Sequence, residues 1–287
     1  MLGLGRLGAA LAVALLAAPA PPVPAVLPPV ARARPSSAAA LEAPLAGAAG
    51  VVAFGEVHQD EAGAGTRSAL ARFTDEIFPA LAPRASHLIV ETWMTTGKCG
   101  QAEERVTTDV ARTTERPAET ESEIVRLLRR AKESGVAPHV LSVSCAEYET
   151  LTGGSGKGVD YDKLLKLTER HLETAIRQAL YLPRSAQRPL VLVYGGALHN
   201  DLHPARTLAP YAFGQAIHAM LKGDYREVDL YVPEFIDRLP AVKGERWYDV
   251  WREAAGKDGT AVIGIARSAR STIVIFPRGV GAERKTP

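Results

Sequence analysis

Leu190-Val-Leu-Val-Tyr194 is a continuous apolar run, and it is followed by Gly195-Gly196-Ala197-Leu198-His199, a glycine pair that leads into a polar turn. Apolar runs of this length bounded by glycine predict strands that are buried on both faces. Three earlier runs have the same character, at residues 51–54, 87–90 and 140–143. The four runs together predict the core strands of one sheet.

Amphipathic segments separate these runs. Apolar residues spaced by three and four over 69–81 predict one helix, and the same spacing predicts another, later helix over about 161–180. Between them, Thr120-x-x-Glu123 is a capping signature that opens a helix, and Gly135 closes it. Strands that alternate with helices predict a mostly parallel central sheet with helices on both faces.

The end of the chain shows a different pattern. Two apolar runs, 261–265 and 272–276, are joined by a short polar turn, which predicts an antiparallel hairpin at the sheet edge. We therefore expect one α/β domain over residues 41–287. Residues 1–25 read as a signal peptide, because one charge precedes a short apolar run and small residues follow it. Residues 26–40 are rich in proline and alanine, which predicts an extended, poorly packing linker.

Charge and composition narrow the function. Lys and Arg number 34 against 32 Asp and Glu, a balance that argues against a nucleic-acid-binding protein. The apolar run near the start is too short to span a bilayer comfortably, so no stable membrane anchor is expected once the signal is cleaved. An exported protein, periplasmic or extracellular, follows from the signal. Cys99 and Cys145 then meet an oxidising compartment, and since each follows a predicted strand on the same edge, a disulfide is expected.

Acids and imidazoles follow three of the predicted strands. Glu56 and His58 come after the first, Glu91 after the second and His199 after the fourth. Ligands of open α/β sheets bind at the carboxyl ends of the strands, where these residues are expected to meet. Glu56 and His58 are two apart, so in extended backbone they point the same way. The set predicts either a divalent metal site or a carboxylate–imidazole acid/base site.

Each residue also has an ordinary structural interpretation. A single histidine beside a strand is more often a capping or hydrogen-bonded loop residue than a catalyst, and Glu91 alone could form a salt bridge with a neighbouring arginine. The joint placement at one sheet edge favours a site. His203 is a weaker ligand candidate, since Pro204 holds it in extended backbone. The glycine-rich stretch at 153–158 lacks the Ser or Thr of a phosphate-binding loop and predicts a surface loop.

The motif Phe54-Gly55-Glu56-Val57-His58, the acid Glu91 after the next strand and the late Gly196-x-x-His199 resemble a superfamily of ChaN-type haem-binding proteins, Tiki/TraB proteins and erythromycin esterases. The resemblance covers roughly residues 51–201. It implies an α/β domain whose motifs line one pocket, and one of three activities: metal-dependent hydrolysis, water activation by Glu and His, or haem capture. Family membership does not decide among them.

Carried over residue by residue, the resemblance implies that a metal ion or His58 activates water, that a glutamate takes its proton, and that His199 binds the metal or steadies the oxyanion. Tyr194 is of the type that ligates haem iron in the superfamily's haem binders. The leading hypothesis is an exported hydrolase acting on a small-molecule or peptide substrate. The alternatives are a non-catalytic haem-binding protein and a degenerate member that binds a partner. The segment from Thr95 to Arg116 is expected to be irregular and to serve as a lid beside the pocket.

Overall fold

Within the described residues, eight strands pair into one mixed sheet, which confirms the predicted α/β class. The computed structural model describes residues 21–63, 65–95, 97–115, 117, 119–152, 158–256 and 259–279. Across the sheet the strands lie in the order β1-β7-β8-β6-β2-β5-β3-β4. Their bounds are β1 (Val30–Arg34), β2 (Val51–Glu56), β3 (Ala85–Thr95), β4 (Ala137–Val143), β5 (Leu190–Gly196), β6 (Tyr225–Tyr231), β7 (Val262–Ala266) and β8 (Ser271–Ile275).

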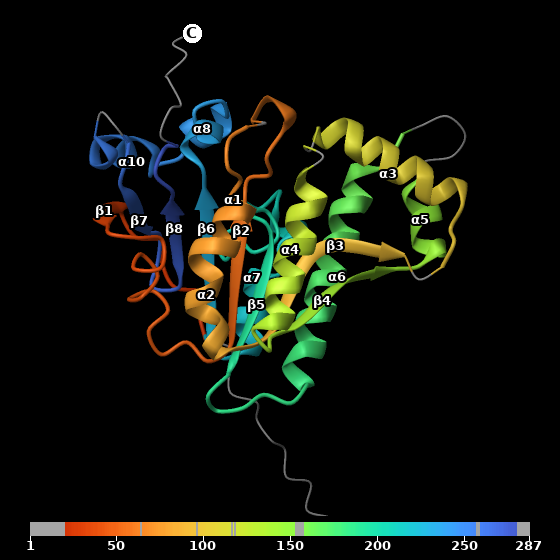
Figure 1. The fold of residues 1–287 in the computed structure, drawn as a ribbon, viewed down its shortest axis with the longest axis horizontal. Coiled ribbons are helices and arrows are strands. Elements are labelled where there is room, and N and C mark those ends of the chain that lie inside the picture. The colour runs from red at the N-terminus through yellow and green to blue at the C-terminus, as the bar shows by residue number, and fades with distance from the viewer. Residues whose placement is uncertain are drawn as a thin grey trace, which may run out of the picture.

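Most neighbouring strands are parallel. β2 pairs in parallel with β5 and β6, β3 with β4 and β5, and β6 with β8. β7 runs antiparallel to β8, so the predicted C-terminal hairpin is confirmed, and β1 adds a further antiparallel strand outside it. β1 and β4 therefore lie at the two ends of the sheet (Figure 1).

Helices cover both faces of this sheet. α1, α2 and α4 lie in front of it in Figure 1, whereas α6 and α7 pack on the opposite face. The α-helices are α1 (Ala69–Arg72), α2 (Phe78–Leu81), α3 (Gln101–Thr114), α4 (Glu119–Glu133), α5 (Cys145–Leu151), α6 (Tyr161–Tyr181), α7 (Gly214–Met220), α8 (Pro233–Ile236), α9 (Pro240–Lys243) and α10 (Tyr248–Ala255). Shorter turns are η1 (Glu61–Gly63), the π-helical turn η2 (Phe73–Ile77), η3 (Ala82–Arg84) and η4 (Ala209–Tyr211).

The apolar runs are continuous because both faces of the central strands are buried. In β2, Val52 and Phe54 pack against the α1 and α4 side, while Val51 and Ala53 pack against the α6 and α7 side. Alternate residues of a strand point to opposite faces, so a strand between two helical layers must be apolar at every position. The same alternation sets the face of the sheet to which each polar side chain on these strands points.

The helix predicted over 69–81 is present, and it runs through α1, η2 and α2 without a break. The capping prediction for the next helix is wrong in detail. α4 begins at Glu119, so Thr120 lies inside the helix. The Glu123 carboxylate does not reach back to cap Thr120 but accepts a hydrogen bond from the Ser68 hydroxyl at 2.6 Å. Glu123 is thereby tied to the start of α1.

The N-terminal part of the sheet differs from the predicted linker. Residues 30–34 form β1, which pairs with β7, and Leu41 and Leu45 are buried in the core. The prolines do not prevent this pairing, because β1 is an edge strand and carries no proline within its bounds. The folded part therefore begins well before residue 41. Most of the predicted signal peptide, residues 1–20, lies outside the described residues.

The segment 95–116, predicted to be irregular, contains α3. The predicted disulfide is confirmed: Cys99, just before α3, is bonded to Cys145, the first residue of α5, with a Cα–Cα distance of 4.9 Å. Around it, Val106, Val143 and Tyr148 belong to a small apolar cluster that is separate from the main core. The disulfide thus joins α3 to the end of the sheet that carries β4.

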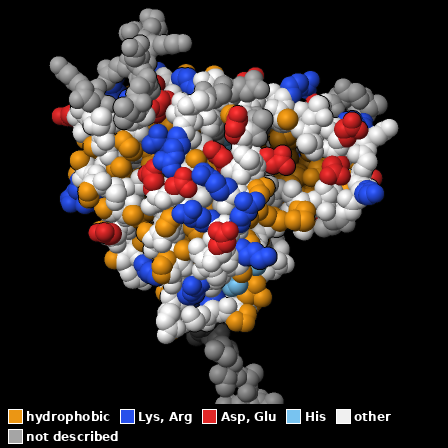
Figure 2. Space-filling model, viewed as in Figure 1, with side chains coloured by type: hydrophobic (Ala, Val, Ile, Leu, Met, Phe, Trp, Pro, Cys, Tyr) orange, Lys and Arg blue, Asp and Glu red, His pale blue; other side chains and the backbone are white. Residues whose placement is uncertain are grey.

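No helix among the described residues combines the length and the apolar character needed to cross a membrane. Basic and acidic side chains are interspersed on the face shown in Figure 2, without a large field of one sign. Arg67, for example, pairs with Asp75 at 2.7 Å and with Glu76 at 2.5 Å, and Arg126 pairs with Asp75 at 3.3 Å.

Candidate functional site

Three neighbouring parallel strands carry the candidate residues. β5 lies between β2 and β3, so the carboxyl ends of all three meet at one edge of the sheet. Glu56 is the last residue of β2 and lies in register with Gly196 of β5. Glu91 was expected to follow the end of its strand. It lies instead within β3, at an irregularity where the pairing with β4 shifts register between Val90 and Trp93.

Glu56 is the centre of a hydrogen-bonded chain. One of its carboxylate oxygens lies 2.9 Å from His58 Nδ1, and the other accepts a hydrogen bond from the Tyr194 hydroxyl at 2.5 Å. Because a carboxylate can only accept, His58 carries its proton on Nδ1 when neutral, and Nε2 is left with its lone pair. The spacing of two residues between Glu56 and His58 produces this contact directly.

Glu91 and His199 form the second half of the site. The Gly196 amide donates to Glu91 Oε2 at 2.7 Å, and His199 Nε2 lies 3.9 Å from Glu91 Oε1. The other nitrogen of His199, Nδ1, donates to the Tyr211 carbonyl at 2.7 Å. His199 is nearly fully buried, so this carbonyl fixes both the orientation of the ring and the neutral tautomer.

Gly196 is the point where the two halves meet. A Cβ placed on this glycine would lie 3.0 Å from His58 Nε2 and 3.6 Å from Glu91 Oε2. Gly195 has even less space, since a Cβ there would lie 2.4 Å from Glu91 Oε2. The glycine pair is therefore needed because the carboxylate and the imidazole occupy the volume that side chains would take, and not only for a tight turn. The structure brings all four predicted residues to this edge.

Solvent reaches one side of the site. The exposed fraction of the side chain is 31% for His58, against 10% for Glu56, 13% for Glu91 and 5% for His199. His58 is thus the residue that water or a substrate meets first. The two glutamates and His199 lie behind it in a less solvated environment, where charges interact more strongly.

The predicted divalent metal finds partial support in these contacts. Both imidazoles donate Nδ1–H to a fixed acceptor, which is how metal-binding histidines are usually oriented. However, both oxygens of Glu56 are engaged by His58 and Tyr194. Over the part of the chain that the structure describes, no three His, Cys, Asp or Glu side chains are arranged to hold a metal ion. The divalent metal therefore stays a prediction.

Tyr194 was proposed as a haem ligand. Its ring is buried, with its centroid 4.7 Å from that of Phe73, and its hydroxyl is directed at Glu56. The phenol therefore supports the acid that orients His58. Haem binding stays a prediction, and the placement of Tyr194 adds no support to it.

Sequence reasoning missed three residues around the site. Glu123 is half-buried, and burial followed by the nearby Glu56 charge raises its pKa above the usual range. Ser68 donates to Glu123 and also caps α1 by accepting from the Ala71 amide at 2.8 Å. Tyr211 acts through its backbone carbonyl, which no sequence pattern marks. In the sequence, Glu123 is the acidic residue of a capping motif, which predicted that it caps a helix and not that it lies near the site.

His203, the weaker ligand candidate, lies beside Asp201 and Arg267. Its amide donates to Asp201 Oδ1 at 2.8 Å, and burial lowers the pKa of its imidazole. This places His203 in a different group of charged residues from the one around Gly196.

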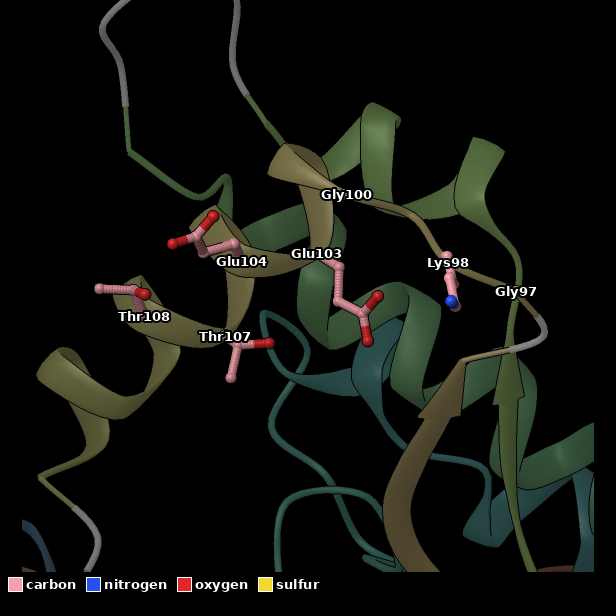
Figure 3. A pocket seen from close by; sticks show the side chains of 7 residues that line it. All are labelled: Gly97, Lys98, Gly100, Glu103, Glu104, Thr107 and Thr108. Carbon is pink, nitrogen blue, oxygen red and sulfur yellow. The ribbon is translucent and has the colours of Figure 1, made fainter.

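An open cavity of about 520 Å³ lies next to the disulfide, at the N-terminal half of α3 (Figure 3). Lys98 and Glu103 point into the space, and Thr107 and Thr108 line it from the helix (Figure 3). None of Glu56, His58, Glu91 or His199 lines this cavity. The segment expected to serve as a lid thus forms a hollow of its own.

Comparisons with known proteins do not identify a family for this chain. No protein-family model, no curated protein and no solved structure matches it.

Proposed function

We propose that this chain is a hydrolase that activates water with the Glu56–His58 pair, acting on a small-molecule or peptide substrate with a polarised carbonyl. The observation that carries the proposal is the hydrogen bond between His58 Nδ1 and Glu56, which leaves Nε2 of a partly exposed imidazole as a base beside Gly196. A histidine base oriented by a carboxylate is a recurrent arrangement in hydrolytic enzymes.

The first step assigns one role to each residue of this pair. His58 Nε2 removes a proton from a water molecule as the water oxygen bonds to the substrate carbonyl carbon, and the carbonyl electrons move onto its oxygen. Glu56 stabilises the imidazolium that forms on His58. Tyr194 holds the Glu56 carboxylate in position through its hydroxyl.

The second step uses the other half of the site. His199 in its protonated form carries a proton on Nε2, which faces Glu91 Oε1 at 3.9 Å. It gives this proton to the leaving group as the carbonyl re-forms and the bond to the leaving group breaks. The products are a carboxylic acid and an alcohol or amine, and solvent returns the two histidines to their starting protonation states. Glu91 Oε1 lies beside the nitrogen that gives up this proton.

The test compares hydrolysis of a panel of p-nitrophenyl esters and chromogenic peptides by wild type, His58→Ala and Glu56→Gln. His171→Ala is the matched control, because His171, on α6, contacts Glu147 of α5 and not the proposed site. Loss of a general base lowers a rate by about 10²–10⁴-fold, so both site variants should fall by at least about 100-fold. A His58→Ala rate equal to wild type, or a wild type inert on the whole panel, would overturn the proposal.

Metal dependence is tested on the same assay. Dialysis against a chelator should leave the wild-type rate unchanged, because water is activated by His58 without a metal ion. A rate that is lost on dialysis and restored by Zn²⁺ would contradict this route and point to the metal site instead.

A further inference from the structure

A group of buried charges lies on the α7 side of the sheet, on β6 and on the turn between β7 and β8. Glu227 and Asp229 are almost fully buried, and both accept hydrogen bonds from Arg267 Nη1, at 2.7 Å and 3.0 Å. Arg267 Nη2 also lies 3.7 Å from Asp201. These three carboxylates share one guanidinium. Buried charge of this kind is costly to keep, so its placement calls for a reason.

Both acids hold the loop that carries His199. Glu227 Oε2 accepts from the Leu202 amide at 2.8 Å, and Asp229 Oδ1 accepts from the Asn200 side-chain amide at 3.2 Å. The Tyr225 hydroxyl, also on β6, donates to the Asn200 carbonyl. The loop is therefore fixed on the C-terminal side of His199, by contacts that come from β6.

The loop position in turn decides where His199 points. The His199 carbonyl accepts from the Phe213 amide at 2.9 Å, and His199 Nδ1 donates to the Tyr211 carbonyl. Space behind the loop is tight, since a Cβ on Gly214 would lie 2.4 Å from the Asp201 carbonyl oxygen. A shift of Asn200 and Leu202 would carry His199 away from the Tyr211 carbonyl and from Glu91.

We propose that Glu227 and Asp229 are positioning residues for His199, acting through Leu202 and Asn200 from the side of the sheet that bears α7. Their carboxylates set the loop so that Nδ1 of His199 meets the Tyr211 carbonyl and Nε2 faces Glu91. This inference rests on the proposed function, because it assigns the two acids to a residue of that site.

Charge in the cluster fits a holding role. Burial raises the pKa of Glu227 well above the usual range and that of Asp229 to about 6, and Arg267 lowers each in part. The two acids therefore bind a proton more readily than exposed carboxylates would. A proton bound to either acid reduces the negative charge that surrounds the Arg267 guanidinium.

The test reads the tautomer of His199 directly, from side-chain ¹⁵N chemical shifts of protein labelled at histidine. Signals are assigned with His199→Gln and His58→Gln. In wild type the neutral His199 should be protonated at Nδ1 alone. Glu227→Ala removes the acceptor of the Leu202 amide and should give a mixture of the two tautomers, while the His58 signals stay unchanged. Glu227→Gln keeps an acceptor oxygen and should restore the wild-type pattern.

Two further variants complete the test. Glu227→Asp draws the carboxylate back by one methylene without removing the charge, so it gives the same reading if Glu227→Ala does not fold. Asp249→Ala, at an exposed acid on α10, is the control and should leave His199 unchanged. Wild-type His199 signals in folded Glu227→Ala or Glu227→Asp would overturn the inference. The readout needs no substrate, so its outcome is separate from the loss or survival of hydrolysis in His58→Ala.

Discussion

Removal of the Cys99–Cys145 disulfide should lower the stability of the domain by about 4 kcal/mol. The bond closes a loop with a sequence separation of 46 residues. In the chain-entropy relation, a loop of this length costs the unfolded state about 13 cal/mol/K, or about 4 kcal/mol at room temperature. At about 2 °C per kcal/mol for a domain of this size, the melting temperature should fall by about 8 °C.

The assay is thermal and urea unfolding of the double variant Cys99→Ser, Cys145→Ser, followed by circular dichroism. Wild type in reducing buffer should unfold as the double variant does, and the double variant should not respond to the reductant. A melting temperature within about 2 °C of oxidised wild type would refute the reasoning. It would mean that α3 and its small apolar cluster separate from the core before the rest unfolds, so that the cross-link does not constrain the global transition.

Three other predictions concern the core and the buried acids. Gly55→Ala should destabilise by about 1–3 kcal/mol in urea unfolding, because the new Cβ would lie 2.5 Å from Asn200 Oδ1, in a site with no room for it. Phe73→Ala should cost about 3–5 kcal/mol in the same measurement, since the ring is fully buried and packs against the rings of Phe54 and Tyr194. Burial raises the pKa of Asp229 from 3.8 to about 6, so its protonated form stabilises the fold below about pH 4 and this contribution is lost as the pH rises through 6. In Asp229→Asn the unfolding free energy should no longer fall between about pH 4 and pH 6 on account of this group. The control Asp249→Asn, at an exposed site, should show the same fall as wild type.

Some strands were predictable because they are buried on both faces, so that their consecutive residues are apolar. β2 and β5 are apolar on both faces and were found at once. β6 was missed, because Arg226, Glu227 and Asp229 interrupt its apolar pattern. These acids are tolerated inside the sheet because Arg267, about 40 residues further along the chain, neutralises them in part. A compensating charge at that distance in sequence leaves no local signal.

The edge strand β1 illustrates a second limit. Its flanking prolines predict a linker, and its own residues are mostly exposed. Its pairing partner, β7, lies more than 200 residues away in sequence. Pairing of this kind is decided by which edge of the finished sheet stays open, which the local composition does not record.

For the candidate site, the sequence alone predicted that Glu56 and His58 point the same way, because side chains two residues apart in extended backbone share a face; the hydrogen bond between them came from the structure. It also determined that Glu91 and His199 accompany apolar strands, and that the glycine pair precedes His199. Only the tertiary structure decided that β5 lies between β2 and β3, and so brought His58 and Glu91 against the same glycine, Gly196, and His199 to within 3.9 Å of Glu91. The reason is physical: alternation along a strand is set by bonded neighbours, whereas strand order is set by packing and hydrogen bonds between segments that no short stretch of sequence contains.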